Sequence, residues 1–261
     1  MRSKRDEAAI RAQAGSRSRR DDAPPDAIEE PSWAIPVAVI LAVGILSLGF
    51  LAYYFAPTVS EILGHAPKPS QDVQPVDVTI AGVRHLIPAN YTRFAYGRRG
   101  GMQDKIELYA LLPDFKPYEP DNAEAFQDYS ADSRVVYFDI EIRRDGMTEE
   151  QRFRKLYLRL VTDNQGSRGP YGLRRYSFDP STGYHEEELL VKEHDDGTVT
   201  VFRCYQELSN IASPSCRRDL ELGDGLALHY RFMRSQLSNW QDIDQGVRAL
   251  VKSFVVAPKP Q

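Results

Sequence analysis

The chain has 261 residues, enough for one domain of ordinary size plus extensions. Its 33 Lys and Arg against 37 Asp and Glu leave a net charge of −4, which argues against a nucleic-acid-binding protein because such proteins usually carry a basic excess. Hydrophobic residues make up 42%, a share that excludes wholesale disorder.

The first segment, residues 1–32, mixes basic and acidic residues with Ala, Ser and a Pro24-Pro25 pair. It contains almost nothing that a folded core could bury, so we predict a disordered cytoplasmic tail. The tail is too short for a catalytic or DNA-binding output domain.

The next segment, Trp33–Phe55, contains no charged residue. A helix of this length spans roughly 34 Å, enough to cross a hydrocarbon core of about 30 Å. Trp33 at one end and Tyr53 and Tyr54 at the other lie where aromatic residues meet a membrane interface. The segment therefore predicts a transmembrane helix that contacts the lipid bilayer.

Two other interpretations of this segment fit less well. A cleaved signal peptide has an apolar core of about 7–15 residues and a small-x-small cleavage site, and Thr58-Val59-Ser60 is a poor candidate for such a site. A core helix of a soluble domain would show a polar face, which the segment lacks.

The basic residues that flank the span predict its orientation. Arg17, Arg19 and Arg20 precede it within about 20 residues, whereas only Lys68 follows within a similar distance. We expect a single-pass protein of a bacterial inner membrane with its N-terminus in the cytoplasm. A Pro-rich stalk, residues 56–75, would then separate the membrane from a periplasmic domain, residues 76–257.

The two cysteines, Cys204 and Cys216, both lie in the part predicted to be exported. In an oxidising compartment they would form a disulfide that stabilises the domain by roughly 3 kcal/mol. A pair of unlinked thiols is the alternative. A zinc site is disfavoured because no second Cys or His pair stands at ligand spacing.

Alternation of apolar and polar residues predicts the strands of the domain. Asp195-Asp196-Gly197 indicates a hairpin turn between two of them. The predicted strands are Val76–Ile80, Val83–Pro88, Ile106–Leu112, Val136–Ile142, Leu189–Glu193, Thr198–Gln206 and Leu226–Phe232.

Two segments have helical periodicity instead. Thr148 and Gln151 form a capping-box pattern that begins a predicted helix over 148–162. A second helix begins near Ser238 and carries an apolar stripe to Phe254. Together these elements predict an α+β fold, an antiparallel sheet with about two helices packed on it.

The sequence contains no G-x-S-x-G, H-E-x-x-H, P-loop or Rossmann glycine pattern, so we predict no catalytic residue and no cofactor. The densest group of metal-ligand types surrounds His185 and His194. We interpret it as a solvated strand edge and turn, and we predict no metal site.

The most suggestive surface stretch contains Arg93, Tyr96, Arg98 and Arg99. Arginines beside an aromatic residue could bind a carboxylate or phosphate, or could anchor an interface. The simpler interpretation is a buried aromatic strand end followed by a glycine turn.

In layout, the chain resembles single-pass envelope proteins of Gram-negative bacteria, a resemblance of topology and not of motifs. A sizeable domain held near the membrane, without a catalytic motif and with an inner tail too short for an output module, predicts a non-enzymatic interaction or accessory module that binds another envelope protein. One alternative is a binding module for an acidic small ligand or wall fragment. Another is a periplasmic hydrolase or metalloenzyme built on His185 and His194.

Overall fold

The computed structural model describes residues 33–55, 64–144, 146–207 and 211–257. The predicted tail, residues 1–32, and the first part of the predicted stalk, residues 56–63, lie outside the described residues. The chain divides into two compact units, Met1–Pro57 and Thr58–Gln261.

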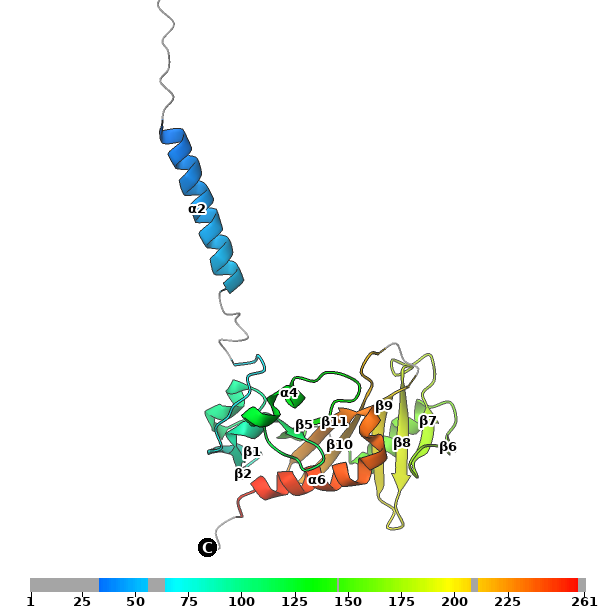
Figure 1. Ribbon diagram of the computed structural model, residues 1–261. Helices are drawn as coiled ribbons and strands as arrows, with labels where there is room; N and C mark the ends of the chain where they lie inside the picture. Colours follow the sequence, from blue (N-terminus) through cyan, green and yellow to red (C-terminus); the bar gives the residue numbers. More distant parts are fainter. Residues whose placement is uncertain (1–32, 56–63, 145, 208–210, 258–261) are drawn as a thin grey trace, which may run out of the picture. The chain divides into compact units, whose positions relative to one another are not determined.

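The described part of the first unit is one helix, α2 (Ala34–Phe55) (Figure 1). Its mean hydropathy of 2.6 and its length are sufficient for crossing a membrane. Every residue of α2 is exposed, whereas a core helix of a soluble domain is mostly buried.

The second unit has the predicted α+β fold. Its large sheet has eight strands in the order β4-β5-β11-β10-β9-β8-β7-β6, with every neighbouring pair antiparallel. A second sheet has the order β2-β1-β3. The strands are β1 (Pro75–Ile80), β2 (Val83–Pro88), β3 (Gly101–Met102), β4 (Lys105–Leu111), β5 (Val135–Ile142), β6 (Ser167–Arg168), β7 (Arg174–Ser177), β8 (Glu187–Glu193), β9 (Val199–Tyr205), β10 (Ser215–Gly223) and β11 (Leu226–Met233).

The two cysteines connect two neighbouring strands, β9 and β10, near the centre of the large sheet. Cys204 on β9 and Cys216 on β10 are register partners, and both are fully buried. Their sulfur atoms lie 2.06 Å apart, the distance of a disulfide.

The helices pack on opposite faces of the large sheet. One face packs against α6 (Trp240–Phe254), whose buried stripe joins the main core with residues such as Phe202 and Leu228 (Figure 1). On the other face, Phe153 of α5 (Glu149–Lys155) packs with Leu189 and Val201 of β8 and β9. A shorter helix, α4 (Ala123–Phe126), packs near the β4 edge.

The helix predicted over 148–162 begins with the expected capping box but ends early. Thr148 Oγ1 accepts a hydrogen bond from the Gln151 N–H, and the Gln151 side chain accepts one from the Thr148 N–H. The α-helix stops at Lys155 and a 3-10 helix, Tyr157–Arg159, follows it. The backbone then joins the sheet region: Val161 forms a bridge with Phe178, and the Leu160 carbonyl accepts a hydrogen bond from the Asp179 N–H.

Candidate functional site

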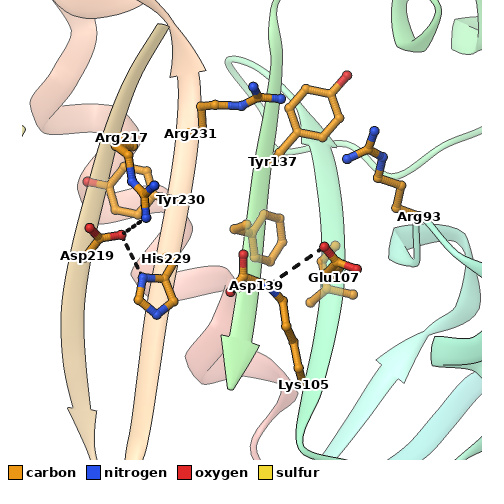
Figure 2. A pocket seen from close by; sticks show the side chains of 12 residues that line it. Arg93, Lys105, Glu107, Tyr137, Asp139, Arg217, Asp219, His229, Tyr230 and Arg231 are labelled. Atoms are coloured by element: carbon orange, nitrogen blue, oxygen red, sulfur yellow. Dashed lines mark hydrogen bonds and ion pairs between the residues drawn. The ribbon is translucent and has the colours of Figure 1, made fainter. Parts of the chain in front are cut away.

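A polar region lies on the sheet face opposite α6, over strands β4, β5, β11 and β10. Side chains alternate between the two faces of a strand, so the outward residues of all four strands gather here. They enclose an open cavity of about 290 Å³ (Figure 2). Its lining residues are Arg93, Lys105, Glu107, Leu108, Tyr137, Phe138, Asp139, Arg217, Asp219, His229, Tyr230 and Arg231.

One row of ionisable residues crosses the four strands. Glu107, Asp139, His229 and Asp219 are successive register partners on β4, β5, β11 and β10. Residues that face one another in this way have neighbouring side chains. The row therefore places three carboxyl groups and an imidazole side by side.

Cations within the sheet balance these carboxylates. The Lys105 Nζ lies 3.3 Å from Asp139, 3.8 Å from Glu107 and 3.8 Å from Glu141. His229 Nδ1 lies 2.7 Å from Asp219, and its Nε2 lies 3.2 Å from Glu141. The result is a half-buried network of ion pairs.

The network shifts the pKa values of its members. Burial lowers the pKa of His229, but its hydrogen bond with Asp219 and the negative charges of Asp139 and Glu141 raise that pKa by more. Burial raises the pKa of Asp219, yet His229 and Arg217 together hold it well below its usual range. Burial also raises the pKa of Asp139, and the charges of Lys105 and His229 oppose this only in part.

Three members of the network could in principle hold a metal ion. Ligand atoms of Asp139, Glu141 and His229 lie within 4.8 Å of one another. However, the Lys105 ammonium already lies among the carboxylates, and both nitrogens of His229 face carboxylate oxygens. A metal ion would have to displace Lys105 and break the Glu141 contact, so the geometry favours the ion-pair network.

A row of arginines runs beside the acidic row. Arg203, Arg217 and Arg231 are register partners on β9, β10 and β11. The guanidinium of Arg231 lies 5.2 Å from the centre of the Tyr137 ring, and that of Arg93 lies 4.9 Å from the same ring. Figure 2 shows the two arginines on either side of Tyr137.

The structure divides the stretch that the sequence singles out. Arg93 lines the cavity, and the Tyr96 hydroxyl donates to Glu107, another lining residue. Arg98 instead donates to Thr92 Oγ1 at 2.9 Å, and Arg99 is exposed outside the lining. Of the four residues, only Arg93 belongs to the lining of this cavity.

The two histidines of the metal and hydrolase hypotheses also lie apart. His185 precedes β8 and His194 follows its last residue, so the whole seven-residue strand separates them. At about 3.3 Å per residue, this distance is far too long for one metal ion to bridge.

Sequence reasoning missed the residues that share the cavity, above all Tyr137, Asp139, His229 and Arg231. The available signal was the polar half of two predicted strands, 136–142 and 226–232. The apolar residues of these strands indicate the core, and the residues between them point to the opposite face, where they come together only once the strands pair.

No protein-family model matches the sequence, and no curated protein matches it either. The fold is similar to that of the immunity protein Smlt3025 of the Stenotrophomonas maltophilia type IV secretion system, with a TM-score of 0.52 and 17% identity over 71% of this chain and 94% of that chain. The Neisseria meningitidis iron-regulated outer membrane lipoprotein FrpD gives a TM-score of 0.47 and 15% identity over 72% of this chain and 96% of that chain. The similarity to the immunity protein concerns the fold alone.

Proposed function

We propose that this chain is a membrane-anchored module of the bacterial envelope that binds another protein and does not catalyse a reaction. In this proposal α2 is a retained single-pass anchor, the N-terminal tail is cytoplasmic, and the α+β domain is periplasmic. The polar sheet face is the binding surface.

The observation that carries the proposal is the gathering of arginine and tyrosine on one accessible face. Arg93 and Tyr137 are half-buried and Arg231 is exposed, and all three line the cavity. Tyr and Arg are enriched among residues that dominate protein–protein binding energy. A cavity of about 290 Å³ is at the lower limit for small-molecule pockets, so it suits side chains of a partner. The fold is compatible with this role, since an immunity protein has it.

Site-specific photo-crosslinking in intact cells tests the binding role. p-Benzoylphenylalanine replaces Tyr137 in the full chain, and Gln241, an exposed residue of α6, provides the matched control position. We expect one reproducible crosslinked protein from position 137 and none from position 241. Absence of a product at 137, in a chain whose disulfide is shown to form, would contradict the proposal.

A reporter fusion tests the anchor and its orientation. Alkaline phosphatase fused after Gln261 should be active in cells, because this enzyme requires an oxidising compartment. Mass spectrometry of the purified chain should find residues 33–55 retained. A fusion without phosphatase activity, or a mature chain without its first sixty residues, would contradict this part of the proposal.

A further inference from the structure

The Arg93–Tyr137–Arg231 cluster, formed by these three residues, is the most cationic part of the cavity. Each guanidinium carbon lies about 5 Å from the Tyr137 ring centre, so the two carbons are at most about 10 Å apart. The two cations lie on either side of this ring, on a surface that solvent reaches (Figure 2).

The two arginines differ from their neighbours in how their charge is balanced. Arg217 lies 2.8 Å from Asp219, and Arg203 lies 2.5 Å from Glu187. Within the described part of the chain, no carboxylate lies within 4.0 Å of the Arg93 or Arg231 guanidinium.

The Arg231 guanidinium is left without a carboxylate partner among the described residues. Its register partner Arg217 turns toward Asp219 instead, at 2.8 Å (Figure 2). An external anion at Arg231 would supply the missing counter-charge. Guanidinium groups bind carboxylates through paired, charge-assisted hydrogen bonds, and the Tyr137 hydroxyl lies nearby as a further donor (Figure 2).

We propose that the Arg93–Tyr137–Arg231 cluster accepts one or two carboxylate side chains from an acidic segment of the protein partner. This inference rests on the proposed function and names the chemistry of the partner. Glu107 and Asp139 lie in the adjoining half of the cavity. Their negative charge disfavours a phosphate, which carries more charge than a carboxylate, and favours a peptide that presents few acids among neutral residues.

A fluorescence-anisotropy titration tests the inference with two dye-labelled peptides, Gly-Glu-Gly-Glu-Gly and its Gln counterpart. The protein is the full chain in phosphatidylcholine nanodiscs. The variants are Arg93→Gln with Arg231→Gln, and, as matched control, Arg248→Gln, an exposed arginine on α6. Inorganic phosphate serves as a competitor.

We expect the Glu peptide to bind at least tenfold more tightly than the Gln peptide. The double variant should lose at least tenfold in affinity, the control should stay within twofold, and added salt should weaken binding. Equal binding of both peptides to the unaltered chain would overturn the inference, and so would an unchanged affinity of a folded double variant. Phosphate that binds more tightly than the peptide would overturn it too.

The two proposals fail in different ways. A crosslinked partner at position 137 together with equal binding of the Glu and Gln peptides would refute the acidic segment and leave the protein-binding role. Tight binding of the Glu peptide without a crosslinked protein would refute the protein-binding role.

Discussion

Arg218 is the residue whose replacement tests most directly how the two faces of the sheet are held together. It is 4% exposed and forms two hydrogen bonds of 2.8 Å with Glu149 at the start of α5. It also donates to Asp244 of α6. Glu149 in turn accepts the Val201 N–H at 2.7 Å. One buried guanidinium thus connects α5, β10 and α6.

Replacement of Arg218 by Met would leave Glu149 buried without its cation. Removal of one partner from a buried ion pair costs about 3–5 kcal/mol of unfolding free energy. Replacement of Glu149 by Leu in the same chain removes the unpaired charge. The double variant should therefore be less destabilised than the sum of the single variants, by about 2–3 kcal/mol.

The loss should also depend on pH. Burial raises the pKa of Glu149, and Arg218 opposes this effect. Without Arg218 the pKa of Glu149 rises further, so the variant can relieve its buried charge by taking up a proton. The free-energy difference between the parent and the Arg218→Met variant should therefore shrink as the pH falls toward 4.5 and grow as the pH rises.

Urea unfolding followed by tryptophan fluorescence measures these differences. The chain has two tryptophans, so Trp33→Phe leaves Trp240 as the reporter. Trp240 is buried and donates to the Tyr171 carbonyl at 3.2 Å, which makes its emission sensitive to loss of the core. A loss below 1 kcal/mol for Arg218→Met, or strict additivity in the double variant, would refute the reasoning.

Two further predictions concern the disulfide and the ion-pair network. Replacement of Cys204 and Cys216 by Ala removes a disulfide between residues separated by 12 positions. It should lower the unfolding free energy by about 3 kcal/mol and Tm by roughly 6–12 °C, which calorimetry can measure. A reductant that fails to lower the Tm of the parent chain would count against this prediction. Since the folded-state pKa of His229 is raised, its stabilisation is complete below pH 6.5 and is lost as the pH rises through that pKa. His229→Gln should therefore reduce the loss of unfolding free energy between pH 6 and 9, measured by urea titration at each pH. Replacement of the exposed His185 by Gln serves as the control and should leave this loss as it is. An unchanged loss in His229→Gln would argue against the charged network.

The sequence predicted the elements whose side chains follow a simple period. Alternation revealed strands 136–142 and 226–232, and the structure has β5 and β11 there. The strand β10, Ser215–Gly223, was missed because Arg218 occupies one of its inward positions and interrupts the apolar pattern. Only the tertiary structure shows that Glu149 and Asp244 make this position acceptable for an arginine.

The site could be predicted only in part. A sequence indicates which side chains of one strand share a face of the sheet, but it does not show which strands pair with that strand. Tyr137 and Asp139 alternate with buried residues, so their outward direction could be inferred. Their proximity to His229 and Arg231 depends on the pairing of β5 with β11, which are far apart in the chain. Arg93 was identified from its local composition, yet its contact with Tyr137 is a tertiary one.

Arg218 and Arg231 use their charge differently, and this difference separates a structural role from a binding role. On the α6 face, Arg218 is buried and engaged with two carboxylates, so its replacement should strongly destabilise the domain. On the opposite face, Arg231 is exposed and contacts a ring instead of an acid, so its replacement should cost little stability and act mainly on partner binding. Since Arg218 and Arg231 lie on neighbouring strands of one sheet, a comparison of their variants distinguishes a binding surface from a structural one within the same chain.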